Sequence, residues 1–181
     1  MKIVKKIFVI VLLLIGLILI VLFDYADRIA IFSKYTPEKD FNEFSFYKTV
    51  EAKQNAYERH FHDTLYEFPR CNAKKVKIFR NIPVISRITG KQVNKTEFLS
   101  FFNTPDNFNW SETTWTINET DYILRFYDFN NKTVGTIWIC FDECGMTESI
   151  PFAPTMKFGG LSGIGKEKLT RMLREIYQLN Q

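Results

Sequence analysis

The strongest constraint on this chain is an uninterrupted apolar run at residues 7–23, IFVIVLLLIGLILIVLF, which contains no charged residue. At 1.5 Å per residue this run makes about 26 Å of helix, and Ile3 and Val4 extend it enough to cross a hydrocarbon layer of about 30 Å. A buried helix of a soluble domain would show a polar face, and this run has none. We therefore expect residues 7–23 to be a transmembrane helix embedded in the lipid bilayer.

A cleaved signal peptide is the alternative interpretation of the run. Signal peptides have a shorter apolar stretch, of roughly 7 to 15 residues, followed by small residues at the cleavage site. Here the run is longer, ends in Phe23-Asp24-Tyr25 and has no cysteine near it to accept a lipid. An uncleaved anchor is favoured.

The distribution of basic residues predicts the orientation of the anchor. Lys2, Lys5 and Lys6 precede the run, whereas only Arg28 and Lys34 lie within the first fifteen residues beyond it. Cytoplasmic flanks carry the excess of basic residues. We expect residues 1–6 in the cytoplasm and the rest of the single-pass chain outside the cytoplasmic membrane, in the periplasmic or extracellular space.

The net charge of +4 is concentrated before the anchor. Removing the three N-terminal lysines from the 24 basic residues leaves 21 against 20 acidic ones. Nucleic-acid-binding domains usually carry a strongly basic patch. The sequence therefore predicts no nucleic-acid partner.

Beyond the anchor we expect a juxtamembrane segment at residues 24–48 and one α+β domain at residues 49–181. Tyr57, Phe61, Leu65 and Phe68 recur at helical spacing, so a helix is expected to end before Pro69. Strands are expected at residues 74–80 and 84–88 from their alternation and β-branched residues. A short helix should follow, capped by Asn94 in capping-box spacing and buried through Phe98, Leu99 and Phe102.

The last third of the chain predicts an antiparallel β-meander packed by helices. Three β-rich runs, at residues 113–117, 122–129 and 133–141, are separated by turns that contain Asn or Asp. Ser162 is expected to cap a C-terminal helix. The apolar face of that helix should cover the sheet with Leu169, Met172, Leu173 and Ile176.

The motifs FYD at residues 126–128, Gly135, ICFDEC at 139–144 and KFGGLS at 157–162 resemble a module of small exported or membrane-anchored bacterial proteins of unknown function. The resemblance covers residues 121–175. It implies the hairpin-and-turn fold of this part and no activity.

Cys140 and Cys144 are the sharpest candidates for chemistry. They lie four apart at the end of an expected strand, unlike the redox C-x-x-C motif, which begins a helix. Thiols outside the membrane oxidise readily, so a structural disulfide is the favoured interpretation. Two separate thiols, a metal-binding pair and a redox-active pair remain alternatives, and Cys71 could pair with either cysteine.

His60 and His62 are the only histidines, and residues two apart on a helix point to different faces. No grouped spacing predicts a metal site. The letters GLSGIGK at residues 160–166 match a phosphate-binding loop, but Glu167 stands where a magnesium-binding Ser or Thr is needed. We therefore expect a turn and helix cap there, and no nucleotide or other cofactor.

Trp110 and Trp115 form an aromatic pair that suits either a core or a binding platform for a sugar or peptide, and the core is favoured. No catalytic residue can be named from the sequence. The expected function is a membrane-anchored extracytoplasmic module with an interaction or structural role, with another envelope protein as partner. The alternative is a thiol-dependent or other enzyme using Cys140 and Cys144.

Overall fold

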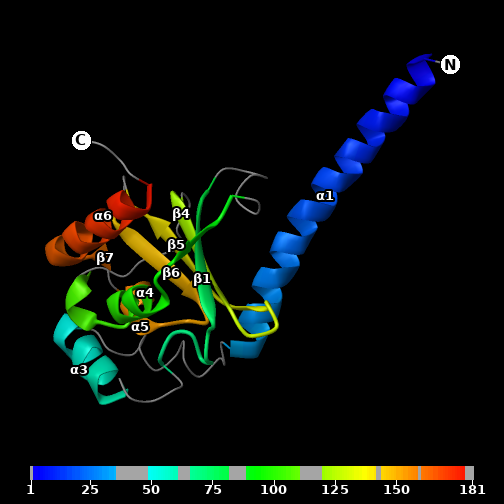
Figure 1. Ribbon diagram of the computed structural model, residues 1–181. Coiled ribbons are helices and arrows are strands. Elements are labelled where there is room, and N and C mark those ends of the chain that lie inside the picture. Colours follow the sequence, from blue (N-terminus) through cyan, green and yellow to red (C-terminus); the bar gives the residue numbers. More distant parts are fainter. Residues whose placement is uncertain are drawn as a thin grey trace.

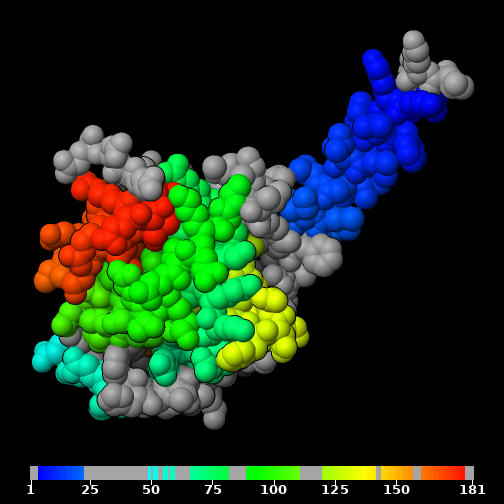
Figure 2. Space-filling model, viewed as in Figure 1, coloured from blue at the N-terminus to red at the C-terminus, as the bar shows by residue number. Residues whose placement is uncertain are grey.

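The computed structural model describes residues 2–35, 49–60, 66–81, 89–110, 120–141, 144–158 and 160–177. Helix α1, Lys2–Tyr35, runs through 34 residues without a break and projects from the body of the molecule (Figures 1 and 2). Its segment Val4–Leu22 has a mean hydropathy of 2.9, and none of it is buried. The helix is long and apolar enough to cross a membrane or to act as a signal sequence.

The other described residues form an α+β architecture around one antiparallel sheet, which confirms the predicted fold class. Seven strands of the described part lie in the order β2-β1-β4-β5-β6-β7-β3. They are β1 (Lys75–Arg80), β2 (Lys91–Val93), β3 (Phe108–Asn109), β4 (Tyr122–Tyr127), β5 (Thr133–Cys140), β6 (Met146–Ile150) and β7 (Gly160–Leu161). The helices are α3 (Val50–His60), α4 (Lys95–Phe102), α5 (Pro154–Phe158) and α6 (Gly163–Tyr177), with a 3₁₀ turn η2 (Pro105–Asn107).

One face of the sheet, the inner face, carries the core. Val76 and Ile78 of β1 pair in register with Phe126 and Leu124 of β4, and all four side chains are almost completely buried. They belong to one apolar cluster with the buried side chains of α4 and α6. Figure 1 shows these two helices on the same side of the sheet. The alternation along β1 therefore selects which face is covered by helices.

Helix α4 begins as the sequence predicts. The Oδ1 atom of Asn94 accepts hydrogen bonds from the backbone N–H groups of Thr96 and Glu97, at 3.1 and 3.4 Å. This cap satisfies two N–H groups that have no partner within the helix. Phe98 and Phe102 are buried as expected, and Leu99 is half-buried against the core.

Helix α6 also matches its predicted cap and face. The Ser162 hydroxyl accepts a hydrogen bond of 3.0 Å from the Gly165 N–H. Leu169, Met172 and Leu173 are buried in the main core cluster, and the half-buried Ile176 packs against it. The predicted packing of α6 over the sheet is confirmed.

Two predicted elements differ from the structure. Residues 66–68 form a turn and bends, so the helix predicted up to Phe68 extends too far, and its described part ends at His60. The described meander consists of β4, β5 and β6, and β6 was not predicted. The sequence of β6, MTESI, does not show the alternation of a half-buried strand, because its inner-face residues Thr147 and Ser149 are polar. The predicted strands at 84–88 and 113–117 lie outside the described residues.

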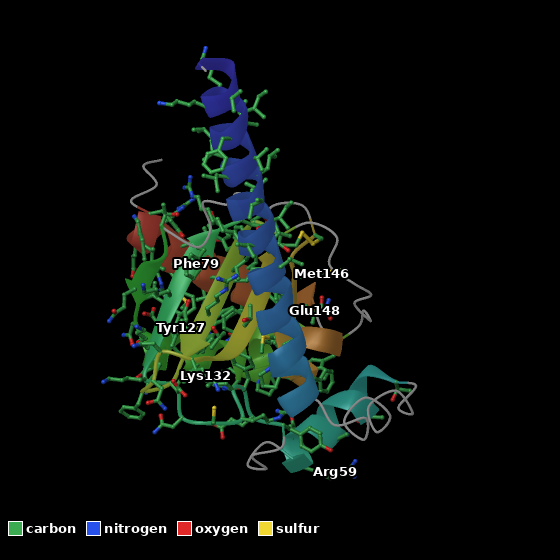
Figure 3. The ribbon with its side chains drawn as sticks, turned by 90° about the vertical axis from the view of Figure 1, so that its right-hand side faces the viewer. Arg59, Phe79, Tyr127, Lys132, Met146 and Glu148 are labelled. Atoms are coloured by element: carbon green, nitrogen blue, oxygen red, sulfur yellow. A yellow bond between two sulfur atoms is a disulfide. The ribbon has the colours of Figure 1, made fainter. Side chains whose placement is uncertain are left out.

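Helix α1 lies against the opposite, outer face of the sheet. It contacts β5 and β6. Figure 3 looks onto this face, with the N-terminal part of α1 at the top and the helix passing in front of the sheet. Phe79 and Met146 mark the end of the sheet nearer the apolar span, and Tyr127 and Lys132 mark the other end (Figure 3).

Candidate functional site

A disulfide closes the connection between β5 and β6. Strand β5 ends at Cys140, which pairs in register with Met146. The sulfur atoms of Cys140 and Cys144 are 2.02 Å apart, and their Cα atoms are 5.7 Å apart. Gly145 follows with φ of +59°, a conformation that suits glycine because it has no Cβ. Cys140 is buried and Cys144 is exposed, so the bond is reachable from one side.

Cys71 lies outside this disulfide, in a loop that lines the larger of two described hollows. This cavity has a volume of about 320 Å³ and is lined by residues 67–73 and Leu99. The Arg70 guanidinium donates hydrogen bonds to the carbonyl oxygens of Glu67 and Phe152, at 3.0 and 2.6 Å. These bonds hold the loop that carries the half-buried Cys71 in place.

The second hollow, of about 160 Å³, lies between α4 and α6. Its floor is the buried Asn107, whose Nδ2 donates to the Phe101 carbonyl at 2.8 Å. Lys168 Nζ donates to Asn107 Oδ1 at 3.1 Å. Both polar ends of the Asn107 side chain are therefore engaged in joining the two helices.

His62 and the side chain of His60 lie outside the described residues. Within the described part, no group of three or more His, Cys, Asp or Glu side chains lies close enough to hold a metal ion.

The phosphate-loop letters at residues 160–166 form β7, the Ser162 cap and the first turn of α6. The Ser162 N–H donates to the Asn107 carbonyl at 3.0 Å. Gly165 packs so tightly that a Cβ atom there would overlap the same carbonyl. The glycine is thus explained by close packing of the helix on η2.

Trp110 is 3% exposed and clusters with Ala56, Tyr66 and Phe152. Its ring is therefore core, which contradicts the platform interpretation for this residue. Trp115 lies outside the described residues.

A tyrosine–cation cluster, which sequence reasoning missed, lies where β1 and α6 end and β2 begins. The Arg80 guanidinium and the Lys91 ammonium each lie 4.8 Å from the ring centroid of Tyr177. The centroid of the Tyr122 ring lies 5.6 Å from the centroid of the Tyr177 ring. Lys91 Nζ also donates a hydrogen bond of 3.0 Å to the Ile176 carbonyl.

The pKa of Tyr177 is raised from 10.0 to about 12. Burial of the side chain is the largest cause, the neighbouring Tyr122 also raises the pKa, and Arg80 opposes the shift. The Tyr177 phenol therefore stays neutral at pH values above those at which a tyrosine ordinarily ionises. Nothing in the sequence linked positions 80, 91 and 177, because only the antiparallel sheet and the packing of α6 bring them together.

Comparisons with protein-family profiles, with curated proteins and with solved structures find no match to this chain.

Proposed function

We propose that the chain is a single-pass membrane protein whose uncleaved N-terminal helix holds an extracytoplasmic domain that binds another envelope protein. The observation that supports this most is the exposed apolar span Val4–Leu22 at the start of a longer helix. Burial of apolar surface stabilises by about 25 cal/mol per Å², so this surface favours a lipid environment strongly over water.

The continuity of α1 supports an anchor over a cleaved signal peptide. The helix continues for thirteen residues beyond Leu22, about 20 Å, up to Tyr35. It contacts β5 and β6, and Figures 1 and 3 show its C-terminal part beside the sheet. Cleavage at the end of the span would cut through this helix.

The same continuity favours an interaction role. A flexible linker would let the domain tumble, whereas a helix that packs on the sheet presents one orientation. Preorganisation of this kind lowers the entropic cost of binding a partner that is also in the membrane plane.

Fractionation tests the anchor. Membranes washed with high salt and then with alkaline carbonate should retain the protein with residues 7–23 still attached. A soluble product that begins after Phe23 would refute the uncleaved anchor.

Protease access tests the orientation. Protease added outside spheroplasts should digest a C-terminal epitope tag while a cytoplasmic marker stays intact. Protection of the tag until the membrane is broken would place the domain on the cytoplasmic side.

Site-specific photo-cross-linking in cells tests the interaction. Phe129 is 67% exposed at the β4–β5 turn, and Ile164 is 61% exposed at the start of α6, so each accepts a photoreactive side chain without disturbing the core. A buried position, Phe126, serves as the control. Discrete adducts from an exposed position but not from Phe126 are expected, and their absence from surface positions around the domain would refute the interaction role.

The exposure of Cys144 supports a second candidate, a thiol-dependent enzyme. An incoming thiolate could attack the exposed sulfur and release the Cys140 thiolate, so the pair would pass through a mixed disulfide. Trapping that mixed disulfide with a Cys140→Ser variant would support the enzyme. A disulfide that stays intact in the folded protein under excess dithiothreitol would exclude this role.

A further inference from the structure

This inference rests on the proposed membrane anchor. We propose that the tyrosine–cation cluster of Arg80, Lys91 and Tyr177 lies on the phospholipid headgroup layer, where the two cations bind lipid phosphates and fix the tilt of the domain on the bilayer.

The position of the cluster follows from the strand register and from Figure 3. Phe79 lies at the end of the sheet that faces the apolar span of α1 (Figure 3). Arg80 follows it as the last residue of β1, and Lys91 begins the neighbouring strand β2. Helix α6 ends at the same place with Tyr177. The cluster is thus at the end of the domain nearest the bilayer.

The chemistry of the three side chains suits a headgroup layer. A guanidinium can donate two parallel hydrogen bonds to a phosphate, and an ammonium is a compact phosphate partner. Both Arg80 and Lys91 are exposed. Tyr177 is a half-buried aromatic with a polar tip, the kind of side chain that is enriched at membrane interfaces. Its ring holds both cations at one place.

One acidic residue, Asp121, lies close to the end of β1 in the strand register. Asp121 directly precedes β4, and its Oδ2 accepts a hydrogen bond of 2.6 Å from the Phe141 N–H. Other exposed lysines, such as Lys74 and Lys132, lie at the opposite end of the sheet. Positive charge alone therefore does not distinguish the tyrosine–cation cluster from other exposed lysines. The position of the cluster relative to α1 is what favours its contact with the headgroup layer.

A purely structural role for the cations is the competing explanation. Lys91 donates to the Ile176 carbonyl, and cations are favourable at a helix C-terminus. The two roles are separable because a glutamine at position 91 can still donate to that carbonyl while it carries no charge.

The test uses the full chain reconstituted in vesicles, with Cys71 replaced by Ser to leave one labelling site. A bimane label is attached at Asn81→Cys, next to Arg80, or at Asn130→Cys, in the exposed turn at the opposite end of the sheet. A nitroxide on the lipid headgroup quenches nearby labels. We expect stronger quenching at position 81 than at 130, and more of it in mixed phosphatidylcholine–phosphatidylglycerol vesicles than in phosphatidylcholine alone.

Charge removal then separates lipid binding from proximity. The Arg80→Gln/Lys91→Gln variant should lower the docked-to-undocked ratio at position 81 by about fivefold for each cation removed, and high salt should do the same. The conservative variant Arg80→Lys keeps the positive charge and should keep most of the quenching at position 81. The matched control Lys74→Gln/Lys132→Gln removes the same charge at the other end and should leave the quenching unchanged.

Equal quenching at both positions would overturn the proposal, as would quenching at position 81 that ignores lipid charge, salt and the double variant. Flotation of the vesicles reports insertion independently. Protein that does not float with vesicles contradicts the anchor itself, whereas inserted protein without charge-dependent quenching contradicts only the headgroup contact.

Discussion

Replacing Leu173 with alanine tests whether α6 closes the core. Leu173 is 2% exposed and belongs to the main apolar cluster. The change removes three carbons, worth about 2.4 kcal/mol at about 0.8 kcal/mol for each buried methylene group. The remaining cavity adds to this, and measured Leu→Ala costs lie at about 2 to 5 kcal/mol. If the free energy of unfolding falls by about 3 kcal/mol, the melting temperature of a domain of this size should fall by about 12 °C.

The assay must report tertiary structure. Helix α1 keeps its far-ultraviolet signal in detergent, so melting of the full chain is followed by fluorescence of tryptophans such as the buried Trp110. The control is Arg174→Ala, an exposed neighbour on the same helix. Lys168 is a poorer control because its Nζ donates to Asn107. Equal, small shifts for Leu173→Ala and Arg174→Ala would mean that α6 is peripheral and would refute the packing.

Three further predictions concern stability. Gly165→Ala should destabilise the domain, because the added Cβ would overlap the Asn107 carbonyl, although alanine is the better helix former by about 1 kcal/mol. The control Gly163→Ala has open space for its Cβ and should not destabilise the domain. Equal melting temperatures of the two variants would contradict the close packing. Asn94→Ala should cost about 1 kcal/mol in urea unfolding through loss of the α4 cap, and no change would mean that the cap is replaced by water. The pKa of Tyr177 is about 12 in the folded state, above the unfolded value of 10.0, so the stability that Tyr177 contributes is present below pH 10 and is lost as the pH rises towards 12. Tyr177→Phe should flatten this alkaline decline in a pH series of melting curves, and an unchanged decline would contradict the raised pKa of Tyr177.

Local patterns carried much of the fold prediction. The cap at Asn94, the cap at Ser162 and the apolar face around Leu169 depend on residues within one or two turns, so they can be read directly. Strand β6 could not be recognised in this way. Its buried Thr147 and Ser149 resemble a solvated segment until the neighbouring strand β5 is known.

The candidate sites show the same division. Cys140 and Cys144 are four residues apart, so their closeness was foreseeable from spacing, although the sequence left their chemistry open. Trp110 was ambiguous because an aromatic residue suits a core or a platform equally well, and only its burial against Phe152 decided the question.

Length, charge and periodicity are properties of neighbouring residues, so an apolar helix at residues 7–23 and an α+β domain after it could be predicted from local patterns. That α1 continues as far as Tyr35 and lies against β5 and β6 depends on tertiary packing. Likewise, only the tertiary structure brought Arg80, Lys91 and Tyr177 to one end of the sheet. The physical reason is that strand register and helix docking are set by the burial of many distant side chains at once, which no local pattern contains.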